Sequence, residues 1–556
     1  MSPSPRYPLS HLLTDSVLRR WVWARLRGQW QDRRDSPPAL LHLGLPQEQP
    51  CPLAWPDRER PPVPSAPLAL PLPGGALVIP PDQPGLAFDH YAQDPVIAPA
   101  LHGFAWATGQ SVPPAWSHLL VQEWLRRYAD APLTSAAWGA DVTALRVPLL
   151  LDLVARGGWG GSMAHFSNVL IHHLERLSPD GTTRDLHPLL RGWALLRLAV
   201  ALRMPATLQR AGAFLLEQAE ALIRPSGILN LGSTHWHMVL TRALADSWLT
   251  LCHHQAVALA TPLEPLVRRL VQVLPALTLS GGMPLVGEIC AAWPLTWAEW
   301  RAGLSEEDRD RLDRLVGAQG LSDLEKLRQD GWLRYDRGPW QGLWHCPPGG
   351  WLPADSPTHH QDQTGFEVHY QGVPIFIDPG AGDRRAPELM AAAAGHNAFL
   401  VNGADPYPVN RLCYSPGFQR ELCGPAPQLR SAHDGVSLRL SGYGWQGGPK
   451  ELLRRWTVLP ESLKIEDYLP GTGRCAISRR LITPLAVTRE SESVVRLEDG
   501  AGLVFRLEAE QHPIAIGEGR RSTSDGGSAP VTVLDIGQGT HSLPWLGHIT
   551  VTRITA

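Results

Sequence analysis

Cysteines are few in this 556-residue chain, and long apolar runs are absent. The seven cysteines are scattered and no two have CxxC spacing. That pattern excludes a cysteine zinc site and a disulfide framework. No run reaches the roughly 18 apolar residues that a membrane-spanning helix needs, so we expect no transmembrane segment.

Charge of one sign is also lacking. The formal net charge is -3 and the composition is 44% hydrophobic and 19% charged, which is typical of a globular protein. Without a basic field we expect no nucleic-acid partner. The first 30 residues contain no apolar core followed by a small-residue cleavage site, so we expect no secretory signal and a cytoplasmic location.

The residue pattern changes along the chain. Residues 36–83 are rich in proline, which blocks helices and removes backbone donors, and this predicts an extended arm on the surface. From about 114 to 325, segment after segment places apolar residues at helical spacing. No repeat of fixed period is found, so stacked helix pairs closing into a toroid are favoured over an open solenoid.

After residue 330 the apolar residues alternate with a period of two. Segments such as "GFEVHYQGVPIFID", "HNAFLVNG" and "SLKIEDYLPG" are typical of strands separated by turns. We therefore predict a multidomain α+β fold: an arm over 1–83, an incomplete α/α toroid over 84–328, and a large antiparallel β-sandwich over 329–556.

One stretch at the start of the strand-rich half gathers groups that bind protons and metals. It reads "THHQDQTGFEVHYQGVPIFIDPG" over 358–380. A turn at Gln371-Gly372 predicts a hairpin that brings His360 and Asp378 to neighbouring strand ends, and His396 starts the next strand. Two imidazoles and a carboxylate suit zinc. The alternative is that each is an ordinary cap or solvated turn residue.

The same stretch, with "GHNAFLVNG" after it, resembles the C-terminal region of the heparinase II/III-like family of polysaccharide lyases. That pattern is His-x-His-x-Asp, then a hairpin ending in Asp-Pro-Gly, then His-Asn. The resemblance implies an α/α toroid before a β-sandwich, and a structural zinc held by His360, Asp378 and His396. The first family histidine falls at Thr358, and His359 stands one place later.

The helical half carries a second resemblance, in "GSTHWHMVL". Ser233 or Thr234 is predicted to cap a helix. The family pattern here is Ser-Thr-x-Tyr-His, in which the tyrosine donates the catalytic proton. This chain has Trp236 at that place, and no tyrosine occurs between Tyr128 and Tyr335. An indole cannot donate and recover a proton as a phenol does.

The resemblance also suggests roles for further residues. "MPLVGEICAAW" resembles a Pro-Leu-x-Gly-Asp loop, with Glu288 for Asp, and "HPLLRGWAL" resembles an Asn-His helix. His187 also fits an ordinary helix start, and Arg384 an ordinary solvated loop. The expected catalytic residues are His235, His237, His359 and Glu288. The expected substrate-binding residues are Trp236, Asn397, Arg384 and His187.

The chemistry that the resemblance implies is β-elimination on a uronic acid in an acidic polysaccharide, such as a glycosaminoglycan or alginate. A partner neutralises the C5 carboxylate, a base removes the C5 proton and an acid protonates the leaving oxygen. A non-catalytic relative that binds glycans or assembles envelope polysaccharide is the alternative. The family resemblance itself implies a cell-envelope or periplasmic location, as the alternative to a cytoplasmic one. A toroid glycoside hydrolase needs a second carboxylate opposite Glu288. The sequence predicts no oligomeric state.

Overall fold

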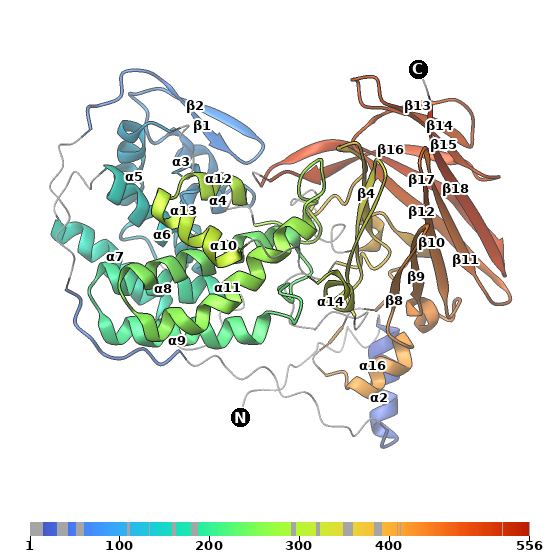
Figure 1. Cartoon of the computed structure of the whole chain (residues 1–556), viewed down its shortest axis with the longest axis horizontal. Coiled ribbons are helices and arrows are strands. Elements are labelled where there is room, and N and C mark those ends of the chain that lie inside the picture. Colours follow the sequence, from blue (N-terminus) through green and yellow to red (C-terminus); the bar gives the residue numbers. More distant parts are fainter. Residues whose placement is uncertain are drawn as a thin grey trace.

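The computed structural model describes most of the chain. The described residues are 15–29, 43–51, 61–107, 112–132, 134–157, 163–179, 187–290, 296–317, 323–348, 360–382, 392–408, 410–411, 413–524 and 526–554. Within them a helical half stands beside a strand-rich half (Figure 1). This confirms the predicted order of an incomplete α/α toroid followed by a large antiparallel β region.

Three antiparallel helix pairs form the body of the toroid. They are α6 (Ala140–Gly157) with α7 (Met163–Leu177), α8 (Pro188–Ala201) with α9 (Pro205–Leu222), and α10 (Thr234–His253) with α11 (Val257–Leu277). Helices α6, α8 and α10 pack side by side in one layer, and α9 and α11 pack together behind them. Their apolar stripes meet in one continuous core that contains Trp193, Leu240 and Phe214.

Shorter helices complete the helical half. Before the pairs lie α3 (Leu86–Tyr91), α4 (Ala98–His102) and α5 (Pro114–Tyr128), and after them α12 (Trp297–Ala302), α13 (Glu306–Val316) and α14 (Leu324–Gln329). Among the described residues, no helix combines the length and the hydropathy that crossing a membrane requires.

The proline-rich arm contains more structure than its composition indicates. Helix α2 (Ser16–Leu26) forms before the proline-rich stretch, and strands β1 (Leu68–Leu72) and β2 (Gly75–Ile79) pair as an antiparallel hairpin. The hairpin turns at Pro73 and Gly74, and Gly74 has a positive φ. Its buried leucines, among them Leu70, join the helical core. An extended arm was expected for this stretch; the leucine alternation at 68–72 makes part of it a strand pair instead.

In the described part of the strand-rich half, the strands form three antiparallel sheets. The first, in the order β3-β4-β5-β6, comprises β3 (Trp332–Arg337), β4 (Trp340–His345), β5 (Phe366–Tyr370) and β6 (Val373–Phe376). The second, β16-β17-β12-β7, comprises β16 (Ile514–Ser522), β17 (Ser528–Ser542), β12 (Arg474–Thr483) and β7 (Phe399–Val401).

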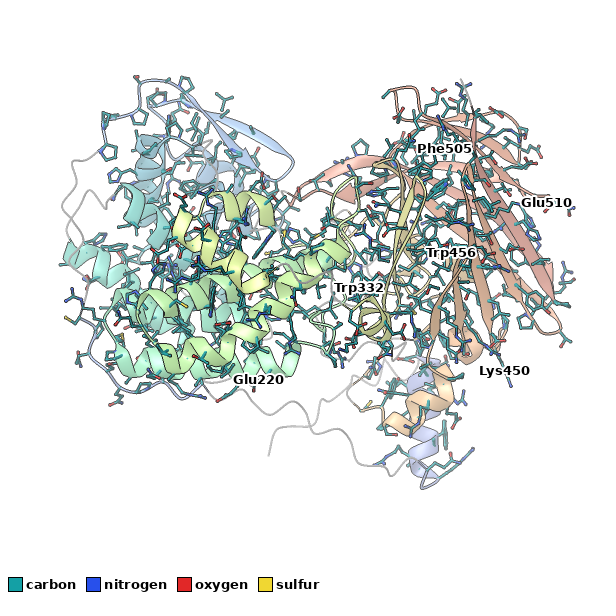
Figure 2. The ribbon with its side chains drawn as sticks, in the orientation of Figure 1. Glu220, Trp332, Lys450, Trp456, Phe505 and Glu510 are labelled. Carbon is teal, nitrogen blue, oxygen red and sulfur yellow. The ribbon has the colours of Figure 1, made fainter. Side chains whose placement is uncertain are left out.

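The third sheet has eight strands in the order β13-β14-β15-β18-β11-β10-β9-β8. They are β13 (Ala486–Arg489), β14 (Val494–Glu498), β15 (Val504–Ala509), β18 (Trp545–Ile554), β11 (Ser462–Leu469), β10 (Leu452–Leu459), β9 (Gly435–Leu440) and β8 (Gln428–Ala432). Helix α16 (Pro416–Cys423) lies beside it. Alternating inward residues of the sheets, such as Trp456 and Phe505, share one core, whereas Lys450 and Glu510 are exposed (Figure 2).

A fully buried ion pair lies inside this core. The guanidinium of Arg454 on β10 donates to both carboxylate oxygens of Asp467 on β11, at 2.7 and 3.3 Å, and neither side chain has exposed surface. Removing one partner of such a pair leaves an uncompensated charge in a region of low polarity.

We expect Arg454→Met to lower the free energy of unfolding by about 3–5 kcal/mol, because Asp467 is then left buried and unpaired. The matched control is Arg439→Met, which removes an exposed pair with Glu451 and costs at most about 1 kcal/mol. Urea denaturation followed by circular dichroism measures both. Equal effects of the two substitutions would contradict the claim that burial makes Arg454 critical.

Candidate functional site at the junction of the two halves

The start of α10 is held by the loop that follows α11. Ser233 caps the helix by accepting from the Trp236 N–H at 3.0 Å, as the sequence predicts. Its hydroxyl donates to the Glu288 carbonyl at 2.6 Å, and Thr234 Oγ1 accepts from the Val286 N–H at 3.1 Å. The segment "STHW" is therefore tied to "MPLVGEIC" through both side chains and backbone.

Two glycines let this loop fit between the two halves. Gly287 has φ +77, and a Cβ there would lie 2.2 Å from the Gly232 carbonyl oxygen just before α10. Gly380, in the Asp-Pro-Gly turn after β6, has φ +59, and a Cβ there would lie 2.6 Å from the Leu285 carbonyl oxygen. Residues 284–290, which we call the junction loop, therefore contact the helical half on one side and the β half on the other.

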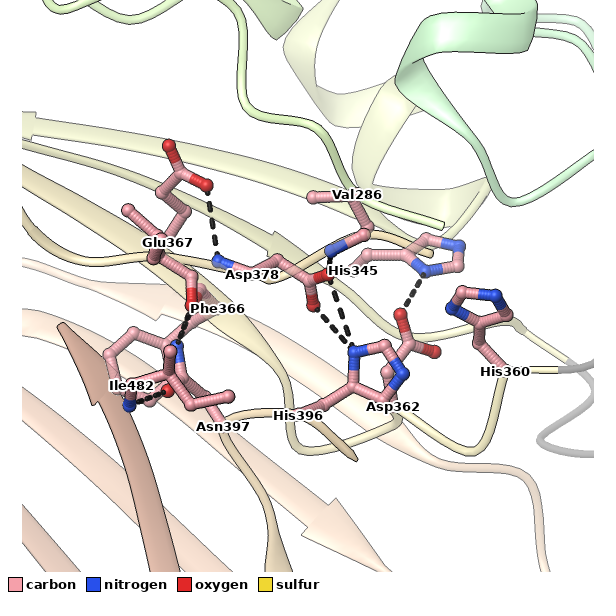
Figure 3. Close-up of polar contacts among 12 residues, drawn as sticks. Val286, His345, His360, Asp362, Phe366, Glu367, Asp378, His396, Asn397 and Ile482 are labelled. Carbon is pink, nitrogen blue, oxygen red and sulfur yellow. Dashed lines mark hydrogen bonds and ion pairs between the residues drawn. The ribbon is translucent and has the colours of Figure 1, made fainter. Parts of the chain in front are cut away.

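Three buried side chains gather next to the junction loop. His360, Asp362 and His396 each place one ligand atom within 4.8 Å of the others (Figure 3). The imidazole centroids of His360 and His396 are 4.9 Å apart. All three side chains are buried. Two imidazoles and one carboxylate form a donor set that suits zinc.

Asp378 lies on the other side of His396. Nδ1 of His396 lies 3.2 and 3.3 Å from the two carboxylate oxygens of Asp378, and the other ring nitrogen points towards Asp362 (Figure 3). Of the three expected metal ligands, His360 and His396 thus lie together. Asp378 contacts His396, and Asp362 is the carboxylate within the compact cluster.

A second histidine, on β4, faces Asp362. Nδ1 of His345 is 3.8 Å from Asp362 Oδ2, and its ring packs against Trp332, with centroids 4.1 Å apart and the planes tilted by 32°. Burial raises the pKa of Asp362, but His345, His396 and His360 together lower it below its usual value. Asp362 is therefore held as a carboxylate. His345 cannot be recognised as a site residue from the sequence, because a histidine inside an apolar strand carries no distinctive signal.

Glu288 extends from the junction loop to the cluster. Its Oε2 is 3.5 Å from His360 Nε2, and its side chain is 34% exposed while that of His360 is 6% exposed. Nδ1 of His360 is buried and has no hydrogen-bond partner among the described residues. An unmatched buried nitrogen beside a carboxylate and a second imidazole is what an absent cation would leave.

His187 and Trp236 form the helical face of the site. His187 caps α8, its Nδ1 accepting from the Leu189 N–H at 3.3 Å. The ring stacks on the Trp236 indole with centroids 6.0 Å apart at 22°. Burial lowers the pKa of His187 to about 4, so the ring is neutral and its proton lies on Nε2. Both side chains are half-buried, and the expected helix-start role of His187 is confirmed.

His235 and His237 follow Thr234 but are held differently from Trp236. Nδ1 of His235 accepts from the Cys290 N–H at 3.1 Å, and the ring is buried. His237 faces the helical core, with Nδ1 3.4 Å from the Leu229 N–H and Nε2 3.3 Å from the Leu270 carbonyl. Burial lowers its pKa to about 4. The sequence suggests a catalytic role for His237, but the Leu229 N–H and the Leu270 carbonyl leave it no ring nitrogen for a substrate.

Asn397 also differs from its expected role. Its Nδ2 donates to the carbonyls of Phe366 and Ile377 at 2.7 and 2.9 Å, and its Oδ1 accepts from the Ile482 N–H at 2.7 Å (Figure 3). The side chain is fully buried. We expected it to bind substrate; instead it joins β5, the end of β6 and β12. His359 and Arg384, the other expected site residues, lie outside the described residues.

A buried polar chain supports the cluster from behind. Nδ1 of His369 accepts from the Gly281 N–H at 3.3 Å, and its Nε2 donates to Glu367 Oε1 at 2.8 Å. The other carboxylate oxygen of Glu367 accepts from the Asp378 N–H at 3.2 Å. The loop after α11 is thereby connected to the turn that carries Asp378. In the sequence these two residues are simply alternating strand positions.

Known proteins resemble this chain in its C-terminal domain and in its fold. The family model for the heparinase II/III-like C-terminal domain matches residues 319–536. A crystal structure of heparinase III shares 15% identity and covers 82% of this chain and 77% of that chain, with a TM-score of 0.60. The heparinase III BT4657 gene product shares 11% identity and covers 84% and 81%, with a TM-score of 0.50.

A search of curated proteins gives no match. At these identities the likeness to solved structures establishes the fold. The fold is the one seen in heparinase III, and residues 319–536 are similar to the heparinase II/III-like C-terminal domain.

We expect Asn397→Ala to lower the free energy of unfolding by about 3 kcal/mol or more, because three buried backbone groups lose their partner. Asn230→Ala is the matched control, since Asn230 is exposed and its side chain bonds only to Arg224; it should change stability by less than about 0.5 kcal/mol. Denaturant titration of both variants measures the difference. A stable Asn397→Ala variant that has lost only glycan binding would restore the substrate-binding role.

Proposed function

We propose that this protein is a polysaccharide lyase-like protein that takes a uronic-acid-containing acidic polysaccharide at the junction of the toroid and the β half. The observation that carries the proposal is that the junction loop joins the two sets of candidate residues. Its backbone holds the start of α10, where Trp236 lies, and its Glu288 side chain reaches His360. A polymer bound there contacts both halves.

Three half-buried side chains would take different roles in the elimination. The Trp236 indole, stacked on His187, offers an apolar face for a sugar ring. The neutral His187 ring carries its proton on Nε2 and can donate a hydrogen bond to a sugar oxygen or carboxylate. Glu288 is the partly exposed carboxylate of the site and is the candidate base for the C5 proton. None of these groups replaces the tyrosine phenol that the family has at the position of Trp236. Protonation of the leaving oxygen is therefore the step of elimination that this chain catalyses least well.

The missing phenol also favours a second candidate function. A chain that retains the fold but lacks the acid can bind an acidic glycan without cleaving it. Trp236 stands where the family has tyrosine, and its stacking on His187 is a binding arrangement rather than an acid–base pair. Cleavage of the glycan and binding of the glycan therefore have to be measured on the same variants.

A structural zinc is the cofactor that we propose. His360 and His396 would hold it, with Asp362 or Asp378 as the carboxylate ligand. Bound there, the ion would supply charge neutralisation among buried carboxylates and link three segments of the β half. The chain itself orients the His396 imidazole, because the Asp378 carboxylate contacts Nδ1 of that ring.

We expect Trp236→Tyr to raise the rate of elimination, since it restores the phenol that can protonate the leaving oxygen. The assay incubates purified protein with heparan sulfate, chondroitin and alginate and follows the ultraviolet absorbance of the unsaturated product. Trp297→Tyr, a half-buried tryptophan on α12, is the control. Glycan binding without elimination in both wild type and variant would establish the binding function instead.

The base is tested by Glu288→Gln in the Trp236→Tyr background. Elimination should fall by roughly 10²-fold, the usual size of a lost general base, with little change in KM. Glu307→Gln on α13 removes an exposed carboxylate of similar size and should leave the rate unchanged. An undiminished rate after Glu288→Gln would assign the base to another residue.

For the metal, we expect about one zinc per chain in protein purified without added metal, and loss of that zinc in His360→Ala together with a lower melting temperature. His433→Ala, an exposed histidine in the β8–β9 turn, is the control. Elemental analysis of Asp362→Asn and Asp378→Asn identifies the carboxylate ligand. Wild-type protein free of zinc, and equally stable with and without a chelator, would overturn the proposal.

A further inference from the structure

Helix α2 lies far from the junction site. Figure 1 shows α2 and α16 side by side, projecting below the rest of the β half. Val17 and Leu18 are buried in the β core and Trp21 packs on Tyr414 with centroids 6.2 Å apart. One face of the helix is thus used to attach it to the strand-rich half.

Polar contacts fix the orientation of the helix. Asp15 caps α2 by accepting from the Leu18 N–H at 2.8 Å, and its other oxygen accepts from Arg411 at 2.7 Å. Arg20 pairs with Glu421 on α16. Because the docked face is held at both its start and its middle, the opposite face is presented in a defined direction.

The outward face combines apolar and cationic side chains. Trp23 is 60% exposed and Leu26 is 72% exposed, and they are one helical turn apart. Arg19 and Arg27 stand four residues before and after Trp23, and both are exposed. Together Trp23 and Leu26 form an apolar spot flanked by cationic side chains on the outward side of the helix.

The charge of this segment is opposite in sign to that of the chain. Residues 16–29 contain four arginines and no acidic residue, whereas the whole chain carries a formal net charge of -3. Arginine-flanked tryptophan and leucine on one helix face are the side chains that settle into the headgroup region of a bilayer. A glycan accounts for the arginines and the tryptophan, but it has no surface that matches Leu26.

We propose that the outward face of α2 docks the protein onto an anionic lipid bilayer. Trp23 and Leu26 enter the boundary between headgroups and acyl chains, and the arginines contact anionic headgroups. The helix lies on the membrane and does not cross it. Attachment through a projecting corner leaves the junction site, on another side of the molecule, open to a polymer. This inference is independent of the proposed function.

The test is co-sedimentation of the full chain with vesicles of phosphatidylcholine containing phosphatidylglycerol, compared with pure phosphatidylcholine vesicles. Wild type should bind the anionic vesicles and lose binding as salt is raised. Arg27→Gln should weaken the partition coefficient by about 5-fold, the effect of about 1 kcal/mol per arginine near an anionic surface. Trp23→Ser/Leu26→Ser should weaken it by roughly 10-fold or more.

Val78→Ser is the matched control, because Val78 is also a strongly exposed hydrophobic residue, at 62%, but lies on β2; it should bind as wild type does. All substituted residues are exposed, and unchanged melting temperatures verify the fold. Vesicle binding that survives Trp23→Ser/Leu26→Ser would overturn the proposal. Binding to soluble heparin with none to anionic vesicles would also overturn it, and would make α2 a polysaccharide contact.

Discussion

The arrangement of the site depends on the hydrogen bonds between the junction loop and the first turn of α10. A helix start leaves backbone N–H groups without partners, and here the side chains that meet this need also bind another segment. Ser233 caps Trp236 and donates to the Glu288 carbonyl, while Thr234 binds the Val286 N–H. The contacts that begin the helix therefore also set the position of Glu288. Because Gly380 lies against the Leu285 carbonyl of the same loop, they also set how the two halves pack against each other.

Buried charge is the second constraint on the β half. Asp362, Asp378 and Glu367 are all buried, and each faces an imidazole: His345, His396 and His369 respectively. Burial raises the pKa of Glu367, whereas at Asp362 the neighbouring histidines outweigh burial and lower the pKa. A cation among His360, Asp362 and His396 would complete this balance, which is why the metal proposal and the stability of this half are linked.

Local pattern was enough to predict several elements. The β5–β6 hairpin follows from a period of two interrupted by Gln371-Gly372, and both residues adopt the positive φ that a two-residue turn requires. The start of α10 follows from Ser233, and the helical and β halves from the change of period. The geometry of these elements is set by residues that are close together in the sequence, so the sequence is enough to predict them.

Other features depend on which segments meet in three dimensions. His237 and Asn397 were expected at the site, yet each is held by backbone groups from distant segments, Leu270 for one and Ile482 for the other. His345 and Asp362 were not assigned a joint role, because nothing in a strand's alternation shows which histidine faces which carboxylate. The β1–β2 hairpin was hidden by the prolines around it. The proline content describes the segment as a whole, whereas strand pairing depends on the residues at a few positions within it.

We propose that one surface, joined by the junction loop, contacts the polymer from both halves. Hydrogen–deuterium exchange with and without a uronic-acid oligosaccharide is the decisive measurement. We expect slower exchange, in the same experiment, at the start of α10, in the junction loop and around His360 to Asp362. Protection confined to another face, such as the outer surface of the eight-stranded sheet, with no change at these three segments, would contradict it.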